Sequence, residues 1–162
     1  MGHKRNRRKK SADWLRLVST KQRTMTAYRD LAAILGAMSR LPLRYWQERM
    51  FFTGARDSEL LRLTGSRFPC KPGHEGTHPV FSLRPLPDGV GFKVCPCSSK
   101  RPLRTRSFRF IKKGCRLSHT GHVMDRNSYL VEAVRFSIPP SVASALFFRG
   151  QAPEKCLQGP GA

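Results

Sequence analysis

The stretch "HPVFSLRPLPDGVGFKVCPCSSK", residues 78–100, decides the fold of this 162-residue chain. It holds two apolar runs on either side of Pro87-Asp88-Gly89. That tripeptide favours a tight turn, because proline fixes φ and glycine adopts positive φ without steric cost. The stretch therefore predicts a β-hairpin with strands at 78–83 and 90–95, and it places Val94 to Cys97 at the end of a strand.

Short apolar runs continue after this hairpin, separated by glycine, proline or polar residues. Five or six such strands with turn signals between them are typical of a small all-β barrel. The later runs are SFRFI (107–111), CRLSH (115–119) and SYLVEAVRFSI (128–138). PPSVASALFFRG (139–150) then begins with prolines suited to a helix start and ends on glycine. We expect a short C-terminal helix there that closes the barrel.

The N-terminal part of the chain has a different composition. Residues 1–12 form a basic arm that we expect to be disordered. Apolar residues at helical spacing predict an amphipathic helix over 24–39, and LRYWQERMFF (43–52) predicts a second, shorter helix. The predicted organisation is a basic, helical extension over 1–55 and a mainly β barrel domain over 56–162.

The charge of the chain restricts its partners. The formal net charge is +21, from 31 Lys+Arg against 10 Asp+Glu. Such an excess favours a polyanionic partner, with nucleic acid ahead of a membrane surface. No stretch approaches the roughly 18 consecutive apolar residues of a membrane span, and no apolar leader follows "MGHKRNRRKK". We therefore expect no membrane partner. The five cysteines are an odd number, and without a leader we expect them to be free thiols in a cytoplasmic protein.

The Cys-Pro-Cys sequence at 95–97 raises two chemical alternatives. Zinc could take four ligands from Cys95, Cys97, Cys115, His119 and His122. The spacing is poor, because structural zinc sites pair their cysteines as C-x₂₋₄-C. A redox pair would need C-x-x-C at a helix N-terminus. We therefore interpret both cysteines as small strand side chains, and we expect neither a metal nor a cofactor.

A basic stripe begins directly after these cysteines. Ser98 and Ser99 end the strand, and seven cations follow with no acidic residue between them: Lys100, Arg101, Arg104, Arg106, Arg109, Lys112 and Lys113. Hydroxyls and cations at a strand end are suited to binding a phosphodiester. The alternative is a solvated loop in a generally basic protein.

Four short motifs occur in sequence between residues 65 and 157. They are Gly73-His74-Glu75, Gly76-Thr77-His78-Pro79-Val80, Pro96-Cys97-Ser98-Ser99, and Asp125-Arg126-Asn127-Ser128-Tyr129 followed by Ile138-Pro139-Pro140-Ser141. In these motifs and their order the chain resembles the MazF/PemK family of toxin ribonucleases. The resemblance implies an SH3-like barrel, usually a homodimer, that is the toxin of a toxin-antitoxin pair and is held by an acidic antitoxin.

The resemblance also implies a chemistry. Family members cleave single-stranded RNA without a metal: the ribose 2′-hydroxyl attacks the adjacent phosphate and leaves a cyclic phosphate. The enzyme must then move protons and stabilise the charge of the phosphorane. Two positions depart from the family pattern, since His78 replaces an arginine and Ser98 replaces a threonine. We expect His78 and Ser98 to be catalytic, with His74 and Glu75 as assisting residues.

Two classes of function follow from the sequence. The first is the endoribonuclease, with His78 moving protons and with charge and RNA contacts supplied by Lys100, Arg101, Arg104 and Arg106. The second is a basic barrel that binds RNA or DNA through cations and through stacking aromatics such as Phe108 and Phe110, and cuts nothing. For His78, a structural role at a strand edge is the alternative to catalysis.

Overall fold

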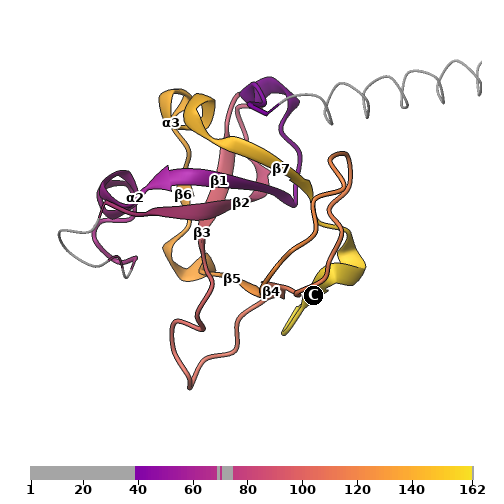
Figure 1. The fold of residues 1–162 in the computed structure, drawn as a ribbon. Helices are drawn as coiled ribbons and strands as arrows, with labels where there is room; N and C mark the ends of the chain where they lie inside the picture. Colours follow the sequence, from indigo (N-terminus) through magenta and orange to yellow (C-terminus); the bar gives the residue numbers. More distant parts are fainter. Residues whose placement is uncertain (1–38, 69, 71–74, 162) are drawn as a thin grey trace, which may run out of the picture. The chain divides into compact units, whose positions relative to one another are not determined.

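The computed structural model describes residues 39–68, 70 and 75–161 (Figure 1). These residues belong to one compact unit of the chain, 35–162. The basic arm over 1–12 lies outside the described residues, as does the expected helix over 24–39 except for its last residue. No helix in the described part has both the length and the apolar character that crossing a membrane requires.

In this described part, eight antiparallel strands form one sheet. The strand order is β7-β1-β2-β3-β5-β4-β8, and β6 pairs with β3. The sheet curls into a half-barrel (Figure 1), so the prediction of a mainly β fold is confirmed. The strands are β1 (Met50–Arg56), β2 (Thr77–Pro85), β3 (Phe92–Ser98), β4 (Phe110–Ile111), β5 (Ser128–Leu130), β6 (Phe136–Ser137), β7 (Phe147–Gln151) and β8 (Leu157–Gln158). The helices are α2 (Asp57–Leu63), α3 (Pro140–Ala145) and the 3₁₀ turns η1 (Leu43–Tyr45), η2 (Glu132–Val134) and η3 (Glu154–Cys156).

The predicted hairpin is confirmed as β2 and β3. Phe81 lies opposite Cys95 in the register, and the turn is closed by a hydrogen bond of 2.9 Å from the Leu86 amide to the Gly91 carbonyl. Gly89 has a φ of +70°, the left-handed conformation that glycine adopts most readily. Because β3 also pairs with β5 and β6, this hairpin is the centre of the sheet.

Cys95 and Cys97 lie in the hydrophobic core. Both are free thiols with 0% exposure, and they belong to the same buried cluster as Phe81 and Leu130. Burial is the main reason why the pKa of the Cys95 thiol is raised. The interpretation of the pair as strand side chains is confirmed.

The predicted helix over 43–52 is wrong. Only Leu43–Tyr45 is helical, as η1, and the chain then enters β1 at Met50. The Trp46 ring stacks on Phe52 with 3.9 Å between centroids, and this contact needs the extended backbone rather than a helix. Residues 50–55, which the sequence placed in the extension, therefore form most of a strand that pairs with β2 and β7.

The C-terminal helix exists but is shorter than predicted. It ends at Ala145, and Phe147–Gln151 is the strand β7. Gly150 does not end a helix; a Cβ there would lie 2.7 Å from the Ser118 carbonyl oxygen. Ser118 itself makes an isolated bridge to Gln151, and the expected strand over 115–119 is not formed.

A disulfide joins Cys115 to Cys156. The expectation that all thiols are free is therefore wrong for these two residues. It also removes Cys115 from the zinc ligands that the sequence offered. The sulfur atoms meet because Lys112, close to Cys115 in the chain, donates its backbone N–H to the Cys156 carbonyl at 3.1 Å. The remaining cysteines, Cys70, Cys95 and Cys97, are free.

Candidate active site

A buried carboxylate holds His78 in a fixed orientation. β1 and β2 pair with Ala55 opposite His78, and Asp57 follows at the start of α2. The Asp57 carboxylate, whose side chain is 8% exposed, therefore reaches the His78 ring, with 2.6 Å between its Oδ1 and Nδ1. The Asp57 amide also donates to the Gly76 carbonyl at 3.0 Å.

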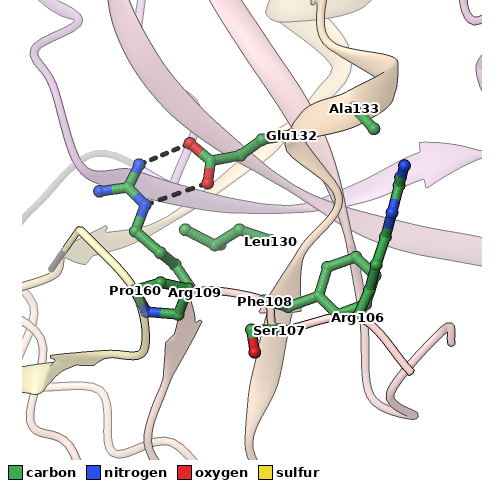
Figure 2. Close-up of a pocket in the computed structure, with 8 residues that line it drawn as sticks. All are labelled: Arg106, Ser107, Phe108, Arg109, Leu130, Glu132, Ala133 and Pro160. Atoms are coloured by element: carbon green, nitrogen blue, oxygen red, sulfur yellow. Dashed lines mark hydrogen bonds and ion pairs between the residues drawn. The ribbon is translucent and has the colours of Figure 1, made fainter. Parts of the chain in front are cut away.

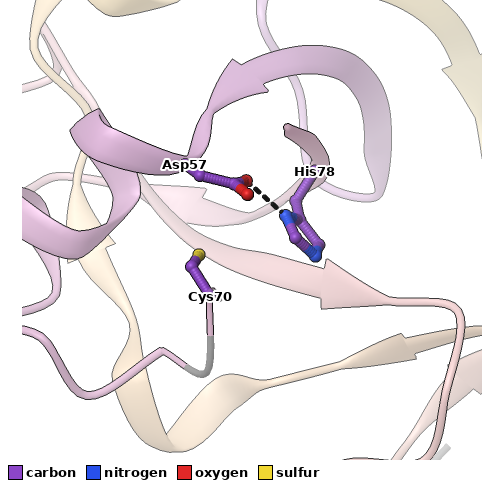
Figure 3. A group of neighbouring side chains, drawn as sticks. All are labelled: Asp57, Cys70 and His78. Atoms are coloured by element: carbon purple, nitrogen blue, oxygen red, sulfur yellow. Dashed lines mark hydrogen bonds and ion pairs between the residues drawn. The ribbon is translucent and has the colours of Figure 1, made fainter. Parts of the chain in front are cut away.

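Gly76 leaves room for this carboxylate. A Cβ at that position would lie 2.7 Å from the Asp57 Oδ2, which is too close for a side chain. The Phe68 ring meets the imidazole edge-on at 4.9 Å and restricts its rotation. Packing and hydrogen bonding together leave His78 one orientation, in which Nδ1 faces the carboxylate and Nε2 lies on the far side of the ring (Figure 3).

This bond decides which tautomer of neutral His78 is favoured. A carboxylate only accepts hydrogen bonds, so Nδ1 carries the proton and donates it. Nε2 is then the acceptor, and it can take a proton from a group in front of it. The Asp57–His78 pair thus has the chemistry of a general base with its orienting carboxylate.

His78 lines a cavity of about 420 Å³. The cavity walls come from β1, β2, β7, the end of β3 and the loop before β5. Its charged or titratable lining side chains, besides His78, are His122, Asp125, Arg126 and Arg149. Ser99, Thr53 and Thr77 add hydroxyl groups. The lining is therefore rich in cations, proton carriers and hydrogen-bond donors.

Arg149 is a cation of this cavity that is held by a hydroxyl group rather than by a carboxylate. It lies on β7, and its Nε donates to the Thr53 hydroxyl of β1 at 2.9 Å. Among the residues that the structure describes, it has no carboxylate partner. Its charge is therefore available to an anion in the cavity.

Arg126 contributes differently. It pairs with its neighbour Asp125 at 2.8 Å, and both side chains are exposed. The hydrogen bond from Arg126 is the main reason why the pKa of Asp125 is lowered, and the charge of Arg126 lowers it further. Exposed neighbouring pairs of this kind are weak, so an anion can compete for Arg126.

Ser98, the predicted catalytic hydroxyl, does not line this cavity. Its Oγ donates to the Lys100 carbonyl at 2.7 Å and accepts from the Lys100 amide at 3.2 Å. These bonds make Ser98 a turn residue at the end of β3. The next residue, Ser99, lines the cavity instead.

None of the other predicted site residues that the structure describes lines the His78 cavity. Lys100, Arg101, Arg104 and Arg106 are exposed in the loop between β3 and β4, and none of them lines the cavity. The Arg101 guanidinium donates to the Arg106 carbonyl at 2.7 and 3.1 Å. Glu75 is exposed just before β2, and His74 lies outside the described residues.

Arg109 is not a free cation of the basic stripe. Its guanidinium makes two hydrogen bonds to the Glu132 carboxylate, at 2.6 and 3.0 Å (Figure 2). The bond to Glu132 is the main cause of a raised pKa at Arg109. The pair lines a second cavity of about 290 Å³, together with Arg106 and Phe108.

One group of side chains near His78 has the composition of a metal site. Asp57, Cys70 and His78 each offer one ligand atom, and these atoms all lie within 4.8 Å of one another (Figure 3). Burial and, after it, the Asp57 carboxylate together raise the pKa of the Cys70 thiol to about 11. None of the zinc ligands weighed from the sequence belongs to this group.

Sequence reasoning identified His78 but missed Asp57, Arg126 and Arg149. Asp57 and His78 are 21 residues apart, and only the pairing of β1 with β2 brings them together. His122, which the sequence offered as a possible zinc ligand, lines the cavity. His119 is bonded to Gln151 at 3.2 Å instead.

No protein-family model, curated protein or solved structure matches this chain.

Proposed function

We propose that this protein is an endoribonuclease that cleaves single-stranded RNA in the His78 cavity by attack of the ribose 2′-hydroxyl on the adjacent phosphate. The observation that carries the proposal is the Asp57–His78 pair, 2.6 Å apart, at the wall of a cavity with Arg126 and Arg149. A base with a fixed acceptor nitrogen and cations that bind a phosphate both serve this reaction.

His78 acts as the general base. Its Nε2 takes the proton of the 2′-hydroxyl while the 2′-oxygen forms a bond to phosphorus and the bond from phosphorus to the 5′-oxygen breaks. The imidazolium that results is stabilised by Asp57, which is buried and cannot be fully solvated by water. The products are a 2′,3′-cyclic phosphate and a 5′-hydroxyl.

The leaving 5′-oxygen needs a proton, and the negative charge of the phosphorane needs cations. His122 lines the same cavity and, when protonated, is suited to the role of general acid. Arg149, held by its bond to Thr53, stabilises the phosphorane oxygens. In this proposal Arg149 binds the phosphate, a role that an arginine at the position of His78 has in the family. Ser99, which lines the cavity, provides the hydroxyl that the sequence assigned to Ser98.

The remaining expectations complete the proposal. The curled sheet is interpreted as an SH3-like barrel of the MazF/PemK type, active as a homodimer in the cytoplasm and inhibited by an acidic antitoxin. The net charge of +21 supports both polyanionic partners, the RNA and the antitoxin. Cleavage in this proposal uses no metal, because the base and the cations are side chains.

The second candidate function is RNA binding without cleavage. The observation in its favour is the loop between β3 and β4, where Lys100, Arg101 and Arg104 are all exposed. Phe108 lines the second cavity beside this loop and offers an aromatic face on which a base can stack. Such a surface would hold single-stranded RNA with no need of His78.

The test separates the two candidates. The full chain is incubated in EDTA with a mixed-sequence RNA, and the fragment ends are analysed. We expect 2′,3′-cyclic phosphate ends, no cleavage of the same sequence as DNA, and a rate loss of roughly 10² to 10⁴-fold in His78→Ala.

His119→Ala is the matched control, because this histidine is bonded to Gln151 and does not line the cavity. It is expected to cleave like the unchanged protein. Intact RNA with tight, salt-sensitive binding would establish the second candidate, and equal rates for the two histidine variants would exclude His78 as the base.

A further inference from the structure

Asp57, Cys70 and His78 present three different ligand types at one point. A carboxylate oxygen, a sulfur and the imidazole Nδ1 all lie within 4.8 Å of one another, and Figure 3 shows the three side chains converging. Within the described residues, this is the group that meets metal-ligand spacing. We propose that it is a binding site for one divalent cation of the zinc class, and that occupancy of the site switches off the base function of His78.

The donor set selects the class of cation. Mixed sulfur, nitrogen and oxygen ligands suit Zn²⁺, whereas Mg²⁺ and Ca²⁺ prefer oxygen alone. Three protein ligands leave a fourth tetrahedral position for water, as in zinc sites that exchange a ligand. The site is therefore one that gains and loses its ion rather than a closed structural site.

The geometry needs only a small adjustment. Ligand atoms of a tetrahedral zinc site are about 3.3 to 3.7 Å apart, whereas the His78 Nδ1 and the Asp57 Oδ1 are now 2.6 Å apart and hydrogen-bonded. The cation replaces the proton between them and separates them by somewhat less than 1 Å. The Cys70 side chain, which is half-buried beside them, then moves toward the ion so that its sulfur becomes the third ligand.

Local charge offsets the overall charge of the protein. A chain with a net charge of +21 repels cations at long range. At this site, however, the ion displaces the thiol proton of Cys70, which is released to solvent, and the resulting thiolate and the Asp57 carboxylate carry two negative charges that neutralise the divalent ion. Asp57 is 6% exposed, so its attraction for the ion is screened little by water.

The coupling to catalysis follows from the two nitrogens of His78. A metal bound at Nδ1 takes the lone pair of that nitrogen, so the remaining ring proton must sit on Nε2. Nε2 then donates a hydrogen bond and cannot accept the proton of a ribose 2′-hydroxyl. Binding also takes the Asp57 carboxylate away from its role as the orienting group. The cation therefore inhibits RNA cleavage, a step that rests on the proposed function.

Binding is tested without reference to activity. The full chain, freed of metal, is titrated with Co²⁺, which gives a thiolate-to-metal charge-transfer band when a cysteine binds it. We expect one equivalent of Co²⁺ to produce the band and one equivalent of Zn²⁺ to remove it. Cys70→Ser should lose the band and Asp57→Asn should weaken Co²⁺ affinity at least about 10-fold, whereas Cys95→Ala, which removes a buried free thiol, should keep it.

Inhibition is tested separately on the same proteins. We expect Zn²⁺ to stop RNA cleavage by the unchanged chain, and Cys70→Ser to cleave normally while needing at least about 10-fold more Zn²⁺ for half-inhibition. Absence of the cobalt band, or its persistence in Cys70→Ser, would overturn the site. A normal band with cleavage that Zn²⁺ does not affect would overturn the coupling alone. A normal band in a protein that never cleaves RNA would overturn the proposed function and its inhibition, and leave the site standing.

Discussion

Each of the two cavities is lined by a basic residue that is paired with a buried or half-buried carboxylate, and the two pairs differ in what they leave unpaired. Glu132 accepts two hydrogen bonds from Arg109 (Figure 2), so both oxygens and the fork of the guanidinium are satisfied within the protein. Asp57 bonds Nδ1 of His78 and leaves Nε2 on the far side of the ring (Figure 3), and His78 lines the other cavity. In the first pair the carboxylate and the guanidinium satisfy each other, whereas in the second the Nε2 of His78 remains available to a ligand.

The charges around the two pairs differ in the same way. The Arg109 guanidinium is neutralised at 2.6 Å by Glu132, and the exposed cations nearby are in a loop. In the His78 cavity, Arg149 is bonded to a hydroxyl rather than to a carboxylate. Under the proposed function, the carboxylate pair of one cavity is structural and that of the other is catalytic, because the second leaves the Nε2 of His78 available in a cavity that Arg149 also lines.

The sharpest way to break this comparison is to neutralise each carboxylate in turn. Asp57→Asn removes the negative charge that stabilises the His78 imidazolium and favours the wrong tautomer. We expect RNA cleavage to fall roughly 10² to 10⁴-fold with a small change in RNA affinity. Glu132→Gln is the matched variant, and we expect it to cleave at a normal rate.

Glu132→Gln, which should cleave RNA normally, should instead lose stability. Glu132→Gln leaves the half-buried Arg109 without its charged partner and should lower the free energy of unfolding by about 1 to 3 kcal/mol, measured in urea. Equal losses of cleavage in both variants would contradict the distinction drawn between the two pairs.

The sequence predicts the centre of this fold and not its edges. The hairpin of β2 and β3 was predicted because an apolar run, a Pro-Asp-Gly turn and a second apolar run are adjacent in the chain. β1 was mistaken for a helix because Tyr45, Trp46 and Met50 also fit helical spacing, and only the contact of Trp46 with Phe52 selects the strand. Local patterns do not contain that contact.

Some residues of the candidate site could be predicted from local sequence, and others could not. His78 could be identified because it stands in a motif, but its partner Asp57 and the cation Arg149 arrive through strand pairings of β1 with β2 and β7. Both Ser98 and Ser99 are hydroxyls at a strand end, and Ser98 was chosen because it stands where the family pattern has a threonine. Their orientations, which decide between them, depend on the turn that Ser98 makes with Lys100.

A second prediction concerns Cys70, which reports on the charge of Asp57. Burial and then the Asp57 carboxylate raise its pKa from 9.0 to about 11. The folded protein holds this proton more tightly than the unfolded chain does. The resulting stabilisation is therefore complete below about pH 9 and is lost as the pH rises through about 11. At pH 9 the thiolate fraction should be about fifty-fold below that of an ordinary cysteine.

The rate of iodoacetamide modification at Cys70, followed against pH by peptide mass analysis, measures this shift. In Asp57→Asn the profile should move part of the way toward pH 9, because the contribution of burial remains. In Glu132→Gln the profile should stay where it is. A profile that does not change in Asp57→Asn would mean that the carboxylate is not charged beside the thiol.

The smallest expected effect contrasts a free with a neutralised arginine of the basic stripe. Arg104 is exposed in the loop between β3 and β4, so Arg104→Gln should weaken RNA binding a few-fold for every sequence and reduce the salt dependence by about one charge. Arg109 is already paired with Glu132, so Arg109→Gln should lower stability while the salt dependence of RNA binding stays the same. Binding titrations at several salt concentrations measure both slopes. If both arginines change the slope equally, Arg109 exchanges Glu132 for RNA phosphate on binding, and the second cavity is part of the RNA surface rather than a closed structural pair.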